Sequence, residues 1–185
     1  LSFHIVSQIG YMIFGLGLFS LAGLAGAVLY IVHHIVVKTT LFLVGGLVEQ
    51  ATGTGQLRRI GGLLRRAPVL AALFAVPALS LAGLPPFSGF VAKLALVEAG
   101  ADAGQWAVVG VSLAVSALTL FSMTKIWGGT FWGEDPGGGV AATGRLSAPP
   151  AMVLATGARG VHSRVIAARA GPLWVRSERA AVDLL

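Results

Sequence analysis

The sequence predicts an all-α fold, a polytopic bundle of transmembrane helices. Of its 185 residues, 56% are hydrophobic and only 11% are charged, and the mean hydropathy is +0.85, well outside the range of ordinary soluble domains. The apolar residues gather in stretches close to the roughly 20 residues that a helix needs to cross a bilayer core. The net charge of +6 does not indicate a nucleic-acid partner, because the arginines fall between apolar stretches, where membrane orientation requires them.

Four stretches are expected to form helices, over about 1–18, 24–48, 67–98 and 106–127. The third is too long for one straight span. Its Pro85-Pro86 pair removes two backbone donors and, together with Gly83 and Gly89, predicts a helix break within the membrane. Irregular backbone at that depth survives only where protein covers it or where it lines a cavity. A plain proline kink is the alternative.

Beyond the fourth stretch the pattern changes. We expect a Gly/Pro-rich loop over 135–148 and an arginine-rich tail over 149–185 in place of a fifth span. A central arginine costs about 2.5–3.5 kcal/mol on insertion. Arginines spaced by five turn about 140° from one to the next, so no single helix face shelters them. The residues concerned are Arg159, His162, Arg164 and Arg169.

The loop charges predict an orientation. The loop over 49–67 holds four arginines, namely Arg58, Arg59, Arg65 and Arg66, against one acidic residue. Such a loop is expected on the cytoplasmic side. The turn around Asp102 has no lysine or arginine and is expected on the opposite side of a bacterial inner membrane, that is, the cell membrane.

A polar stripe lies inside the second stretch, "YIVHHIVVKT". Tyr30, His34 and Lys38 are spaced by four and therefore share one helix face. A lysine stem does not easily reach water from that depth, and an ionisable group so placed indicates an ion or proton path. Burial disfavours the charged amine, so we expect Lys38 to exchange protons. His34 is its natural relay, and His33 lies about 100° off this face.

Two other interpretations of these side chains remain open. The histidines and Tyr30 are also compatible with ordinary packing and hydrogen bonding between helices. A haem held by His4, His33 or His34 is conceivable, but nothing else in the sequence favours it. The chain has no cysteine, and it shows no phosphate loop, no paired nucleophile and base, and no metal-ligand cluster. We therefore expect no enzymatic site, metal or cofactor.

Lys93 gives a second signal, because it follows the predicted break by about one and a half turns. A broken helix, freed backbone groups and a nearby charge are the parts from which transporters build ion sites at the membrane midplane.

At this point the motifs carry a family resemblance. "SFHIVSQIGYMIFGLGL", "AGAVLYIVHHIVVKTTLFLVGGLVE", "LAGLPPFSGFVAKLALVEA" and "TKIWGGTFWGE" occur in order. They resemble the antiporter-like membrane subunits shared by respiratory complex I and the multisubunit Mrp cation/proton antiporters, and are closest to the D-type subunits of the Mrp Na+/H+ antiporters. The resemblance covers about 1–134. It implies the second half of an inverted-repeat transporter, with one broken helix in each repeat, and hence a C-terminal fragment of a longer chain.

The resemblance also implies roles for single residues. Lys38 is similar to the central lysine that links two half-channels, His34 to an adjoining relay residue, and Lys93 to the exit-side lysine on the second broken helix. The implied function is proton movement in exchange for sodium or another monovalent cation, with other membrane subunits as partners. The alternatives are a proton-pumping subunit of complex I or a related hydrogenase, and a non-transporting membrane scaffold.

Overall fold

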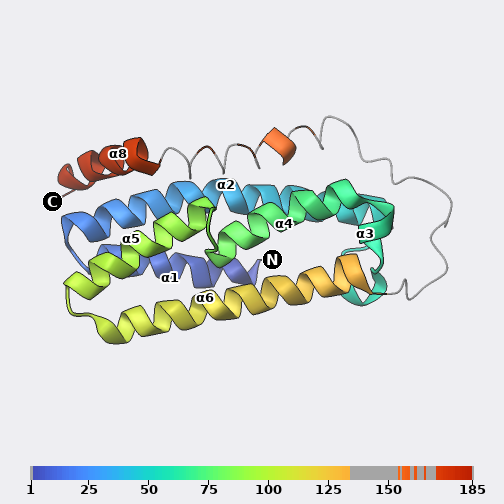
Figure 1. Cartoon of the computed structure of the whole chain (residues 1–185), viewed down its shortest axis with the longest axis horizontal. Coiled ribbons are helices and arrows are strands. Elements are labelled where there is room, and N and C mark those ends of the chain that lie inside the picture. The colour runs from blue at the N-terminus through green and yellow to red at the C-terminus, as the bar shows by residue number, and fades with distance from the viewer. Residues whose placement is uncertain are drawn as a thin grey trace.

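The computed structural model describes residues 2–133, 154, 156–158, 161, 165 and 170–184. Its described part consists of helices and their connections (Figure 1). In chain order these are α1 (Phe3–Gly17), α2 (Leu21–Thr52), the short turn η1 (Leu57–Arg59), α3 (Leu63–Arg66), α4 (Pro68–Ala82), α5 (Ser88–Asp102), α6 (Trp106–Trp127), the π-helical turn η2 (Gly128–Trp132) and α8 (Ala170–Val182).

Helix α2 is the spine of the bundle and packs against α1, α4, α5 and α8. The Ser20 side chain caps its start by accepting a hydrogen bond from the Gly23 amide at 3.1 Å. Its end is set by Gly53, whose φ of 72° is left-handed, a conformation that glycine adopts without steric cost. The helix therefore continues one turn past the apolar stretch, which ends at Val48.

The third apolar stretch forms two helices that follow one another along α2 (Figure 1). Helix α4 ends at Gly83, with a left-handed φ of 87°, and the Gly83 amide donates to the Leu79 and Ser80 carbonyls. Helix α5 begins at Ser88. The five residues between them leave carbonyl groups at the end of α4 without partners in a continuing helix, and this is the feature that positions the site described below.

Two large apolar clusters make up most of the core, and a smaller third one joins α2 to α8. One lies toward the α3 end of the bundle and joins α2, α4, α6 and η2 through residues such as Leu41, Leu47, Phe74, Met123 and Phe131. The other joins α1, α2 and α5 through Tyr11, Leu29, Tyr30, Ala92 and Leu96. Within the described part, α2 and the continuous Trp106–Trp132 helix are each long and apolar enough to span a membrane, while α1 and α4 are shorter apolar helices.

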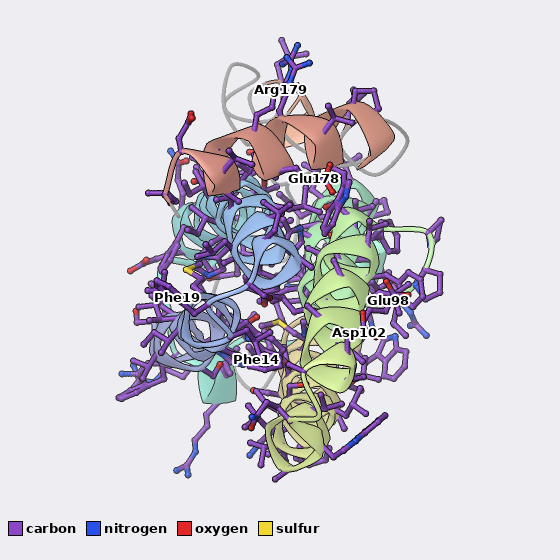
Figure 2. All side chains as sticks on the ribbon, turned by 90° about the vertical axis from the view of Figure 1, so that its left-hand side faces the viewer. Phe14, Phe19, Glu98, Asp102, Glu178 and Arg179 are labelled. Atoms are coloured by element: carbon purple, nitrogen blue, oxygen red, sulfur yellow. The ribbon has the colours of Figure 1, made fainter. Side chains whose placement is uncertain are left out.

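The two ends of the bundle differ in charge. The arginines of the 49–67 loop lie at the end that holds α3, whereas Glu98 and Asp102 of α5 lie at the opposite end, viewed in Figure 2. Helix α8 lies across α2 there, with Arg179 pointing away from the bundle. The loop predicted over 135–148 and the tail residues Arg159, His162, Arg164 and Arg169 lie outside the described residues.

Candidate proton path

Helix α2 carries four polar side chains into the interior. Tyr30 and His33 have no exposed surface, while Lys38 and His34 are only 5% and 7% exposed. They lie on two to three turns of the same helix, because no proline or glycine interrupts α2 between Tyr30 and Lys38. The burial of Lys38 removes its amine from bulk water, which disfavours the charged form unless neighbouring groups compensate it.

Lys93 lies on α5, about one and a half turns past the break, and is 6% exposed. Its Nζ donates to the Ala82 carbonyl at 3.3 Å and to the Ser116 hydroxyl at 3.2 Å. Ala82 is the last residue of α4, so the acceptor is one of the carbonyls that the helix break frees. The Lys93 Nζ also lies 4.7 Å from the centre of the Tyr11 ring, within cation–π range.

His33 faces the same break from α2. Its Nδ1 lies 2.8 Å from the hydroxyl of Ser88, the first residue of α5. That hydroxyl lies 3.3 Å from the hydroxyl of Ser80 in α4. His33 is also within electrostatic range of Lys93. His33, which lies off the Tyr30–His34–Lys38 stripe, thus contacts the helix break. In the sequence, the serines at 80 and 88 on either side of the two prolines are the residues that could have indicated this contact.

Lys38 has a different environment. Its Nζ lies 5.5 Å from the centre of the Phe42 ring, and it is within electrostatic range of His34 and of His4 on α1. Nδ1 of His4 and Nε2 of His34 are buried and have no hydrogen-bond partner among the described residues. Because buried polar atoms are rarely left unsatisfied, we expect water at this level of the bundle.

A hydroxyl and amide network, which the sequence interpretation did not assign to the site, connects α1 to these residues. The Tyr11 hydroxyl lies 2.6 Å from the Ser116 hydroxyl and donates to the Ser112 carbonyl at 2.5 Å. The Tyr11 ring stacks on Tyr30, with ring centres 5.1 Å apart. From the sequence, Tyr11 cannot be distinguished from an aromatic residue that only packs in the core, because most of its side chain is apolar and its position in the helix gives no further indication.

Gln8 extends this network. The Tyr30 hydroxyl donates to its Oε1, and its Nε2 lies 3.4 Å from the Thr119 hydroxyl on α6. Gln8 and Thr119 thus form a hydrogen bond between α1 and α6. Lys93 thus contacts Tyr11 and Ser116, and the Tyr30 ring lies against the rings of Tyr11 and His33. Lys38 instead lies within electrostatic range of His34 and His4.

The arrangement is suited to moving protons. Imidazole and hydroxyl groups lie near each of the two buried amines, and such groups bind and release protons or donate hydrogen bonds. Within the described part of the chain, no group of three or more histidine, aspartate and glutamate side chains is placed to hold a metal ion.

Comparison with known proteins identifies the family. The transmembrane family described as NADH:quinone oxidoreductase/Mrp antiporter matches residues 1–119. This chain belongs to that family. The resemblance drawn from the sequence motifs is thus confirmed, and with it the all-α transmembrane fold.

Members of the NADH:quinone oxidoreductase/Mrp antiporter family resemble this chain closely. The D-type subunit of the Na(+)/H(+) antiporter of Alkalihalophilus pseudofirmus is 51% identical over 135 residues, which are 73% of this chain and 27% of that protein. A chain in the structure of the Mrp complex from a Dietzia species aligns with a TM-score of 0.86 and 36% identity, over 98% of this chain and 41% of the other.

A second solved structure is that of a membrane-bound sulfane sulfur reductase, an archaeal respiratory membrane complex. One of its chains aligns with a TM-score of 0.81 and 26% identity, over 88% of this chain and 26% of the other. Chains of different membrane complexes therefore share this arrangement of helices. The present chain spans about a quarter of the length of the curated relatives that it matches.

Proposed function

We propose that this chain is part of a proton-translocating membrane subunit of a multisubunit Na+(cation)/H+ antiporter. The relatives named as D-type subunits of Na(+)/H(+) antiporters support this assignment. The observation that carries it is the buried amine of Lys93, bonded to the carbonyl that the break in the α4–α5 pair leaves free. A buried amine within a membrane is energetically costly, and its presence therefore indicates a functional role such as transport.

In this proposal protons move between Lys38 and Lys93 by way of His34 and bound water. The mechanism is electrostatic, because two ammonium groups in a poorly solvated space disfavour each other's charge. Protonation of one lysine therefore promotes release of a proton from the other, and the two titrate as a coupled pair.

His33 and Tyr30 complete the proposed path. His33 is fully buried, and its Nδ1 contacts the Ser88 hydroxyl at the start of α5. Protonation of the His33 ring makes Nδ1 the donor of this hydrogen bond. Tyr30 lies edge-on to the His33 ring at 5.6 Å between ring centres. Its hydroxyl bonds Gln8, which makes it the link from the path to α1.

The surroundings that we propose follow from the same assignment. Partners are the lipid bilayer, other membrane subunits of the antiporter complex, protons, and sodium or another monovalent cation. The subunit acts as a secondary transporter, without enzymatic chemistry of its own, in the cell membrane. The 49–67 loop lies on the cytoplasmic side, since its arginines outnumber its acidic residues.

A second candidate is a proton-pumping subunit of a redox-driven complex, such as complex I or a related hydrogenase. The similarity to a chain of an archaeal respiratory membrane complex favours it. The two candidates differ in what drives transport. Cation/proton exchange by the purified complex in vesicles without any redox substrate supports the antiporter, and transport that requires electron flow supports the pump.

The test of the path uses Lys38→Ala and Lys93→Ala in the full-length subunit within its complex, with Lys125→Ala as the control. Lys125 is an exposed lysine near the end of α6. We expect each of the first two substitutions to lower cation/proton exchange by more than about tenfold, and the control to leave it unchanged. Unchanged exchange in both Lys38→Ala and Lys93→Ala contradicts the path and favours a non-transporting scaffold.

A further inference from the structure

A cavity of about 530 Å³ opens at the end of the bundle that holds the 49–67 loop, called the arginine loop below. It is lined by residues of α2, α4, α6, η2 and this loop, together with Ser2. Because one water occupies about 30 Å³ of liquid, the cavity has room for several connected waters. It extends from the loop into the interior. Its lining residues include Ser2, Phe42, Gly46, Glu49, Leu57 and Ile126.

The inner end of this cavity meets the candidate proton path. Lys38, Phe42 and Glu49 are spaced by four and seven along α2 and therefore lie on one helix face. The Phe42 ring lines the cavity and at the same time lies 5.5 Å from the Lys38 Nζ. Phe42 is 43% exposed, whereas Lys38 behind it is 5% exposed. The ring thus separates the cavity from the amine.

Two histidine nitrogens near Lys38 need hydrogen-bond partners that water can supply. The buried ring nitrogens of His4 and His34 that lack partners among the described residues both belong to side chains within electrostatic range of Lys38. Water is the ordinary partner of such atoms. A source of water one helical turn away, on the other side of Phe42, meets this need.

The outer end of the cavity is acidic. Glu49 is exposed and is the one charged residue among those that line it, while the arginines of the loop do not line it. A carboxylate at the mouth of a cleft with low-dielectric walls raises the local concentration of cations, protons included. Glu49 lies about 16 Å from Lys38 along the helix axis.

We propose that this cavity is a water-filled proton inlet from the arginine-loop side to Lys38, with Glu49 at its mouth and the Phe42 ring as its inner gate. The inlet gives the second half of the subunit its own access to that side of the membrane. The inference rests on the proposed function of Lys38, but the inlet itself is a matter of water access, which is measurable without any transport.

Cysteine labelling tests the inlet directly, because this chain has no cysteine of its own. The full-length subunit, with any cysteines outside this chain replaced, receives Phe42→Cys in the assembled complex. A membrane-impermeant, positively charged methanethiosulfonate reagent is applied from each side of sealed vesicles. Gln56→Cys in the arginine loop marks the side, and Phe121→Cys, which is 69% exposed on α6 away from the cavity, is the lipid-facing control.

We expect Phe42→Cys to react only from the side on which Gln56→Cys reacts, and Phe121→Cys to react from neither side. Ile126→Cys, which lines the cavity from α6, gives the same readout if the Phe42 variant does not assemble. A Phe42→Cys or Ile126→Cys subunit that assembles but is inert from both sides, or reacts from the opposite side, overturns the inlet.

A second measurement tests the gate. Lys38→Cys is expected to react slowly from the arginine-loop side, and Phe42→Ala is expected to accelerate that reaction at least about tenfold. An unchanged rate overturns the role of Phe42. Failure of the proposed function is separate from these results, since it appears as unchanged exchange in Lys38→Ala while labelling of the cavity persists.

Discussion

At the scale of single residues, Ser116 stands out because it contacts both the Lys93 amine and the Tyr11 hydroxyl. A hydrogen bond to a charged group contributes about 1.5–3 kcal/mol. We predict that Ser116→Ala lowers cation/proton exchange about tenfold without preventing assembly of the complex. The measurement is the initial rate of exchange in vesicles that contain equal amounts of complex.

Two variants make this prediction specific. Ser122→Ala lies six residues further along α6, on another face of the helix, and is expected to behave as the unmodified protein. Ser116→Thr keeps a hydroxyl and is expected to restore most of the exchange. Full activity of Ser116→Ala would mean that the amine of Lys93 does not depend on this contact.

Sequence reasoning found the buried charges but not their neighbours. Lys38 and Lys93 were predictable, since an amine within a long apolar stretch violates the ordinary composition of a membrane helix. Tyr11 was not, because a tyrosine in such a helix is ordinary packing material. The spacing favours His34 over His33, because His33 lies off the Tyr30–Lys38 stripe, but in the structure the His33 face of α2 packs against the break.

At the scale of helices, the break depends on a close approach that only glycine permits. A Cβ added to Gly89 would lie 1.7 Å from the Ser80 carbonyl oxygen and 2.9 Å from Cε1 of His33. The first of these contacts involves backbone, so side-chain rotation does not relieve it. Overpacking of this kind typically costs about 1–3 kcal/mol or more.

We therefore predict that Gly89→Ala lowers the thermal unfolding midpoint of the purified complex or prevents its assembly. Gly10→Ala is the matched control, because a Cβ on Gly10 meets nothing within 4 Å, and it is expected to leave the midpoint unchanged. If both variants melted alike, the tight junction between α4 and α5 would not be a feature of the protein in solution.

The helix boundaries show where hydropathy stops being informative. The expected helix over 24–48 ends where the apolar residues end, but α2 continues to Thr52, because backbone hydrogen bonds extend through Glu49 and Gln50 until Gly53 terminates the helix. The polar last turn is what brings Glu49 to the mouth of the cavity. An apolar stretch therefore gives the depth of a span and not the full length of its helix.

At the scale of the whole molecule, the charge difference between the two ends of the bundle predicts its orientation. Gln56 in the arginine loop and Gln105 in the opposite turn are both exposed and lie at opposite ends. We predict that Gln56→Cys reacts with an impermeant thiol reagent from the cytoplasmic side and Gln105→Cys from the other side.

The two glutamine positions serve as controls for each other, since their side chains and exposure are alike. Labelling of both from the same side would contradict the predicted crossing of the membrane between them. The reverse pattern would retain the bundle and invert its orientation, so the loop would then not be cytoplasmic.

The sequence by itself determined the class of the molecule, the main apolar stretches, the two buried lysines and the family. These follow from composition and local order, because a charge or a broken backbone within an apolar stretch is costly in hydrocarbon and can be recognised before its neighbours are known. Tertiary structure decided which side chains meet the amines. Tyr11 and Ser116 reach the level of Lys93 from helices far away in the chain. Ser112, Ser116 and Thr119 are spaced by four and three and therefore share one face of α6. Only packing shows that this face meets Tyr11, Lys93 and Gln8.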